Sequence, residues 1–188
     1  MMTHSILQSR KRLLLAWMAV LPWMAGCSKA SQASDNSRLS KSDGIGMTLV
    51  VDAVEGAKMG QVVIYDDRGL IIYSSATVAR HQRGILALSS GRIPLSAHAI
   101  WGRDRHYDFG HAAWYGGTIL GDYTIPVAER IPDAVLHELR VHPRGNLRLK
   151  LRLKPDGVLF GWDIERTAPL GDVSIFEMPG GDFAETRY

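Results

Sequence analysis

The stretch Asn146–Lys154 reads Asn-Leu-Arg-Leu-Lys-Leu-Arg-Leu-Lys, so leucine and a cation alternate strictly along it. Successive side chains of a β-strand point to opposite faces, and this pattern therefore predicts one buried leucine face and one basic face. Pro155-Asp156-Gly157 follows as a turn sequence. Large apolar residues then alternate again from Val158 to Ile164. The two runs together predict a β-hairpin that buries one of its faces.

Seven further runs have the Val, Ile, Leu and aromatic content that is typical of strands. The second and third of them flank Asp66-Asp67-Arg68-Gly69, a hairpin loop in which the glycine can adopt a positive φ. The predicted strands are Met47–Val54, Gln61–Tyr65, Leu70–Ser75, Ile85–Leu88, Leu95–Trp101, Ala112–Tyr115 and Ile119–Val127.

One helix is expected among the strands, at about 131–142. Pro132 suits the first helical position, and Ile131, Val135 and Leu139 recur at spacings of four, which gives one apolar face. So short a helix is marginal on its own, and it has to pack on the sheet. The predicted fold is mainly β, an antiparallel sheet or sandwich with one short helix.

The amino terminus has the parts of a secretory signal peptide: a basic run Arg10-Lys11-Arg12, an apolar run Leu13–Met24 and small residues after it. The apolar run has 12 residues, whereas a helix that spans a bilayer needs about 20. Met24-Ala25-Gly26-Cys27 resembles the lipobox of bacterial lipoproteins. This resemblance implies cleavage before Cys27, a diacylglyceryl group on its sulfur and an acylated amine.

In that family an Asp after the cysteine favours retention in the inner membrane, so Ser28 implies an outer-membrane lipoprotein that faces the periplasm. Cys27 is the single cysteine, and after lipidation no thiol remains for a disulfide. Residues 28–43 contain six serines and one large apolar residue, which is typical of a flexible tether. We expect a signal peptide at 1–26, a lipidated tether at 27–43 and one domain at 44–188.

The charge balance gives no reason to expect a nucleic-acid partner. The chain has 22 Lys and Arg against 19 Asp and Glu, but three of the cations and none of the acids precede Cys27. The chain that remains after cleavage has no net charge. Such a balance does not produce the basic field that attracts nucleic acid. The partners implied are the membrane, through the lipid, and a protein.

The sequence carries no recognisable catalytic motif, because Gly-x-Ser-x-Gly and phosphate-binding glycine patterns are absent. We therefore expect no enzyme, no catalytic residue and no cofactor beyond the covalent lipid. The alternative is a metal-dependent enzyme with His98, His106 and His111 as ligands. Their spacing is not a known ligand pattern, and histidines in a polar connection are more often solvated, so we expect no metal.

Two surfaces are candidates for contacting a partner. The first is the polar connection after Leu95–Trp101 together with the predicted strand Ala112–Tyr115 that follows it. These segments gather aromatic and charged residues, namely Arg103, Arg105, His106, Asp108, Trp114 and Tyr115. For its two aromatic residues the alternative is burial in the core. The second is the basic face, with Arg148, Lys150 and Arg152. Its alternative is a solvated sheet surface that Asp163 and Glu165 partly neutralise from the next strand.

Three functions remain open. The lipobox, the Ser-rich tether and the tail from Ile131-Pro132-Asp133 to Gly161-Trp162-Asp163-Ile164 resemble immunity lipoproteins encoded beside type VI secreted toxins, often phospholipases. This resemblance implies a binding protein that captures a toxin effector in the periplasm. The alternatives are a general cell-envelope lipoprotein that binds peptidoglycan or an outer-membrane or secretion assembly, and the metal-dependent enzyme.

Overall fold

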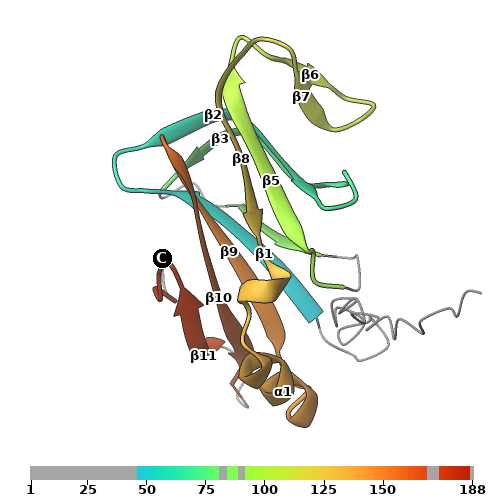
Figure 1. Cartoon of the computed structure of the whole chain (residues 1–188), viewed down its shortest axis with the longest axis vertical. Helices are drawn as coiled ribbons and strands as arrows, with labels where there is room; N and C mark the ends of the chain where they lie inside the picture. Colours follow the sequence, from blue (N-terminus) through green and yellow to red (C-terminus); the bar gives the residue numbers. More distant parts are fainter. Residues whose placement is uncertain (1–45, 81–83, 89–91, 169–173, 187–188) are drawn as a thin grey trace, which may run out of the picture. The chain divides into compact units, whose positions relative to one another are not determined.

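The structure is a computed structural model that describes residues 46–80, 84–88, 92–168 and 174–186 (Figure 1). These residues belong to one compact unit within Ser34–Tyr188. The expected signal peptide, the lipobox cysteine Cys27 and the whole of the expected tether up to residue 43 lie outside the described residues. No helix in the described ranges is long and apolar enough to cross a membrane.

Strands dominate this unit, which confirms the predicted fold class. Five strands form one sheet in the order β11-β10-β9-β1-β4, and four form a second sheet in the order β3-β2-β5-β8. The strands of the first sheet are β1 (Gly46–Ala53), β4 (Gly84–Ala87), β9 (Asn146–Lys154), β10 (Gly157–Thr167) and β11 (Ser174–Gly181). Those of the second are β2 (Lys58–Asp66), β3 (Ile71–Ala79), β5 (Ser96–Arg103) and β8 (Thr118–Pro126).

β9 and β10 are the hairpin predicted from the alternating runs. Leu151 lies opposite Phe160, and Arg148 lies opposite Asp163 in the antiparallel register. The four leucines of β9 are at most 2% exposed. They join Phe160, Trp162 and Ile164 in a core that also takes residues from the second sheet. The leucine face is therefore buried as the alternation predicted.

The single α-helix also lies where the sequence placed it. α1 (Asp133–Val141) follows a short 3₁₀ turn, Ala128–Arg130. Ile131, Val135 and Leu139 are at most 5% exposed, which confirms the predicted apolar face. Pro132 caps the helix in an extended conformation and is not its first helical residue, so the helix is shorter than the predicted range.

Two features of the sheets differ from the prediction. β1 and β9 run parallel, so the first sheet is mixed and not antiparallel throughout. β6 (His106–Asp108) and β11 were not predicted as strands. The sequence of β11 contains Pro179 and two glycines, which count against a strand. It is accommodated because β11 is the edge strand of its sheet.

Candidate functional site

β6 and β7 (Ala113–Tyr115), which lie between β5 and β8 in the sequence, form a small two-stranded sheet of their own. His106 pairs with Tyr115 and Tyr107 with Trp114 across it. We call His106–Tyr115 the aromatic hairpin. It lies at the end of β5 and β8, at the top of Figure 1, and it contains most of the residues that the sequence singled out for partner contact.

The base of the aromatic hairpin is held by reciprocal hydrogen bonds between Arg105 and Gln61 of β2. The Arg105 amide donates to Gln61 Oε1 at 2.9 Å, and Gln61 Nε2 donates to the Arg105 carbonyl oxygen at 3.0 Å. The guanidinium donates to the Gln61 carbonyl oxygen at 2.9 Å and to that of Trp114. Arg105 is only 8% exposed, and burial lowers its pKa. It anchors the hairpin and does not contribute to the surface.

The chain leaves the hairpin through a position that requires glycine. Gly117 has φ +66°, in the left-handed region that side chains disfavour. A Cβ there would lie 2.4 Å from the carbonyl oxygen of Arg103 and 2.7 Å from the amide nitrogen of Arg105. The two chain segments at the hairpin base can approach each other this closely because no side chain lies between them.

Aromatic rings cover the hairpin. Tyr107 contacts Phe109 edge-on and Trp114 at a tilt, with ring centroids 5.0 Å apart in both cases. Tyr115 contacts the rings of His106 and His111, each at 6.2 Å. Tyr107, Trp114 and Tyr115 are half-buried. These contacts leave a partly exposed aromatic surface that is fixed in place by its own packing.

Asp108 shapes the loop at the tip. Its carboxylate accepts hydrogen bonds from the amides of Gly110 and His111 at 2.7 and 3.2 Å, and its other oxygen lies 2.8 Å from His111 Nδ1. The hydrogen bond with the His111 side chain, followed by that from the Gly110 amide, lowers the pKa of Asp108. The loop therefore presents Phe109, which is 89% exposed.

The sequence-based candidates in this region have different roles. Arg103 and His106 are exposed, whereas Arg105 is buried. Asp108 supports the loop, and Trp114 and Tyr115 form the aromatic surface. Phe109 was missed. The signal in the sequence was a large apolar residue between Asp108 and Gly110, in a polar connection of the kind that runs over the protein surface.

The basic face of β9 is covered, so the expectation of an accessible basic surface is wrong. Arg148, Lys150 and Arg152 are 5%, 0% and 6% exposed. Residues Asp182–Thr186, which we call the C-terminal strap, lie against this face. Lys150 Nζ donates to the Glu185 carbonyl oxygen at 2.8 Å, and Arg148 Nη2 donates to that of Thr186 at 2.9 Å.

Carboxylates on neighbouring strands compensate the buried cations. Asp163 of β10 accepts two hydrogen bonds from Arg148, at 2.6 and 2.7 Å, and lies 3.0 Å from Lys150 Nζ. This confirms Asp163 as the neutralising group, whereas Glu165 lies opposite Asn146 and not opposite a cation. Burial nevertheless lowers the pKa of Lys150.

The three histidines proposed as alternative metal ligands have other neighbours. His98 Nε2 lies 2.6 Å from an Asp122 carboxylate oxygen, and His111 lies beside Asp108. His106 contacts the ring of Tyr115. Within the part of the chain that the structure describes, no group of three or more His, Cys, Asp or Glu side chains is arranged to hold a metal ion.

No protein-family model, curated protein or solved structure matches this chain. Its function is therefore inferred from the aromatic hairpin and the sequence features described above.

Proposed function

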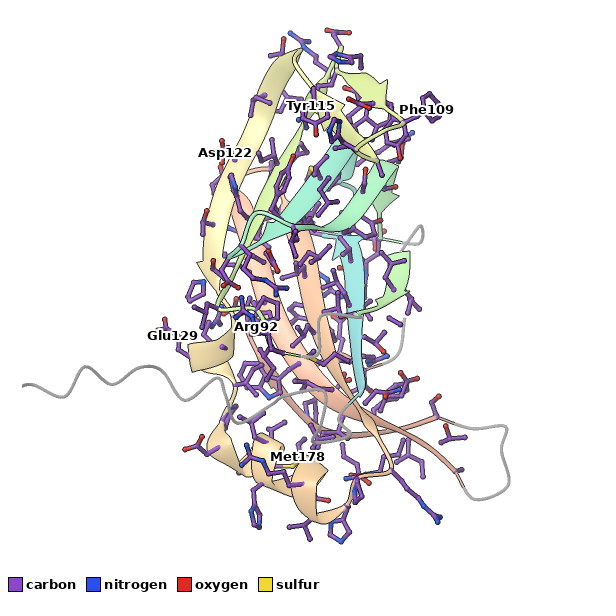
Figure 2. All side chains as sticks on the ribbon, turned by 90° about the vertical axis from the view of Figure 1, so that its right-hand side faces the viewer. Arg92, Phe109, Tyr115, Asp122, Glu129 and Met178 are labelled. Carbon is purple, nitrogen blue, oxygen red and sulfur yellow. The ribbon has the colours of Figure 1, made fainter. Side chains whose placement is uncertain are left out.

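We propose that this protein is a lipid-anchored, periplasm-facing binding protein that neutralises a type VI secreted toxin, such as a phospholipase effector. The aromatic hairpin is its contact surface. The lipid anchor rests on the lipobox resemblance at Cys27, and the toxin class rests on the resemblance to immunity lipoproteins. The contact surface rests on the side chain of Phe109, which points away from the strands at the tip of the hairpin (Figure 2).

An exposed phenylalanine of this kind supports a binding role on energetic grounds. A ring in water forgoes about 1.5–3 kcal/mol that burial would provide. Aromatic side chains in the centre of an interface often contribute most of its affinity. Phe109 is 89% exposed, and a partner that covers it recovers this free energy.

The support beneath Phe109 favours tight binding. The Arg105–Gln61 hydrogen bonds hold the base of the hairpin, and Asp108 holds the loop. A surface that is already ordered loses little conformational entropy when a partner binds. His106 and His111 are exposed and contact the ring of Tyr115, so polar residues border the aromatic surface as they do at the rim of protein interfaces.

A site-specific crosslink tests this contact surface. The photoreactive residue p-benzoylphenylalanine replaces Phe109 in one strain and Leu70 in a control strain, because Leu70 is also exposed, at 54%, but lies in the β2–β3 loop. Cells exposed to an attacker with type VI secretion should give a crosslink to one delivered toxin from position 109 and none from position 70. A crosslink to peptidoglycan-associated or resident outer-membrane proteins would indicate the general envelope function instead.

A competition assay tests the neutralising activity. Cells that carry Phe109→Ala should survive the attacker less well than cells that carry Leu70→Ala, because losing the ring weakens toxin binding by about 2–3 kcal/mol, or roughly 30- to 150-fold in Kd. Full protection by Phe109→Ala at wild-type protein levels would exclude the aromatic hairpin as the contact surface.

A further inference from the structure

We propose that the partner protein adds an extended segment to the second sheet along the open edge of β8, with an apolar side chain beside Leu120 and a basic side chain beside Asp122. This inference deepens the proposed function and rests on it for the identity of the partner, the delivered toxin. It adds the mode of recognition, which is backbone pairing next to the aromatic hairpin, and the kind of segment that is recognised.

β8 is the outermost strand of the second sheet. In the order β3-β2-β5-β8 it pairs with β5, and within the ranges that the structure describes it pairs with no other strand. An edge strand presents a row of backbone N–H and C=O groups with which a strand of another protein can pair. From Gly121 to Pro126 the register with β5 is uninterrupted, so this part of the edge is a regular template for one more strand.

The other three sheet edges have features that disfavour such pairing. β4 has only four residues, β11 contains Pro179, and β3 has one exposed residue among nine. β8 also has nine residues, but six of them are exposed, none is Lys or Arg, and its proline is the last residue. Short edges, prolines and cations are means by which natural sheets avoid pairing at their edges. β8 has none of these along its length, which singles it out as the edge that accepts a strand.

Two consecutive apolar residues are exposed near the start of β8. Ile119 is 46% exposed and Leu120 is 55% exposed. The pairing with β5 shifts at this point, because Gly121 lies opposite Trp101 whereas Ile119 lies opposite Gly102, and Leu120 has no opposite residue. A bulge of this kind re-aims a side chain. An added segment with an apolar side chain here would remove Leu120 from water, as cross-strand apolar pairs do.

The edge is continuous with the aromatic hairpin. β8 follows the hairpin directly, and Gly116 and Gly117 link Tyr115 to Thr118, the first residue of the strand (Figure 1). A partner that covers the Tyr115 ring therefore lies beside the start of β8. Protein interfaces of ordinary size take about 20–30 residues from each partner, so one interface includes both the hairpin and the edge.

Asp122 defines the charge of the segment. Its carboxylate lies 2.6 Å from His98 Nε2 of β5, and its side chain is still 59% exposed. The next exposed residues of β8, Thr124 and Pro126, carry no charge. Opposite charges on adjacent strands stabilise a sheet, whereas like charges destabilise it. A Lys or Arg of the added segment therefore fits beside Asp122, and an acidic residue does not.

Site-specific crosslinking maps the pairing. The photoreactive residue p-benzoylphenylalanine replaces Leu120 in one strain, Thr124 in a second and Ile85 in a control strain, because Ile85 is also exposed, at 54%, on an edge strand of the other sheet. These strains meet the same attacker as the strain with the photoreactive residue at position 109, and mass spectrometry identifies the crosslinked toxin residues. Positions 120 and 124 should attach to one segment of the toxin captured at position 109, at sites about four residues apart, since paired strands advance in step. Position 85 should give no crosslink.

The chemistry of the segment is tested by binding of that purified toxin to the full chain in detergent micelles. Leu120→Lys and Asp122→Lys should each weaken binding at least tenfold, because each places a cation where the segment is apolar or basic. Ile85→Lys is the matched control and should leave the affinity unchanged. The three side chains are exposed, so all three variants should keep the wild-type melting temperature.

The outcomes separate this proposal from the proposed function. If position 109 captures a toxin but positions 120 and 124 give no crosslink or attach to separate segments, strand pairing is overturned and the proposed function stands. Wild-type affinity of Leu120→Lys and Asp122→Lys, or a crosslink from position 85 to the same segment, also overturns it. If position 109 captures no toxin while positions 120 and 124 attach in register to another protein, strand pairing stands and the proposed function fails. If none of these positions captures a protein, both fail.

Discussion

The Asp163→Asn variant should unfold much more easily than the wild type, because it removes the carboxylate that two buried cations share. Asp163 is 0% exposed, with Arg148 nitrogens at 2.6 and 2.7 Å and Lys150 Nζ at 3.0 Å. Asparagine has nearly the same volume, so the substitution changes the charge and leaves the packing almost unaltered.

Removing one partner of a buried ion pair costs about 3–5 kcal/mol. The lower end applies here, since Arg148 keeps its hydrogen bond to the Thr186 carbonyl oxygen and Lys150 keeps that to Glu185. We therefore expect the free energy of unfolding to fall by about 3 kcal/mol. In a domain of about 140 residues this lowers Tm by roughly 10 °C.

Urea unfolding at neutral pH, followed by the fluorescence of the buried Trp101 and Trp162, measures this change. Lys150→Met is the control, because it removes a buried charge but leaves Asp163 bound by Arg148, and it should cost less than about 1.5 kcal/mol. A loss below about 1 kcal/mol for Asp163→Asn, or an equal loss for Lys150→Met, would refute the view that this carboxylate makes the burial of the cations tolerable.

Three further predictions follow from other parts of the chain. Gly117→Ala should destabilise the hairpin base by about 1–3 kcal/mol through backbone strain. The expected result is faster amide hydrogen exchange in residues 106–115. Unchanged exchange would contradict the close approach of Gly117 to the Arg103 carbonyl oxygen. Hydrogen bonds, first of all from Arg152, hold the pKa of Glu185 below its usual 4.5. The Glu185 carboxylate therefore stabilises the folded state fully above pH 4.5, and this stabilisation is lost as the pH falls through the lower pKa of the folded state. Melting temperatures measured across this range should fall less steeply for Glu185→Gln than for the wild type. Cys27→Ser should move the protein out of the membrane fraction, and its continued presence there after processing would exclude the lipid anchor.

The sequence predicts those parts of the fold that depend on local patterns. The alternation in Asn146–Lys154 predicts β9 with its observed bounds, because burying one face demands a period of two. The spacing of Ile131, Val135 and Leu139 predicts the buried face of α1 for the same kind of reason. In both elements the local sequence alone predicts which face is apolar, with no information from any other segment.

Features that depend on distant partners could not be predicted in this way. A row of Arg and Lys on one face of β9 is typical of a solvated surface. Its burial depends on Glu185, 33 residues after Arg152 in the sequence, and on Asp52 of β1. The candidate contacts in the aromatic hairpin were found from composition alone. The sequence could not show that Arg105 is buried while Phe109 is exposed, because the burial of Arg105 depends on its hydrogen bonds with Gln61 of another strand.

The parallel pairing of β1 with β9 has a consequence for the order in which the chain can assemble. Asp52 and Arg152 lie opposite each other in this pair, 100 residues apart along the chain. β1 lies between β4 and β9 in the sheet. Its edge toward β9 stays unpaired until the chain has been synthesised as far as Lys154. Contacts of such long sequence separation slow folding and prolong the time during which strand edges are open to aggregation. The nascent protein should therefore depend on a holding chaperone until its last third has emerged.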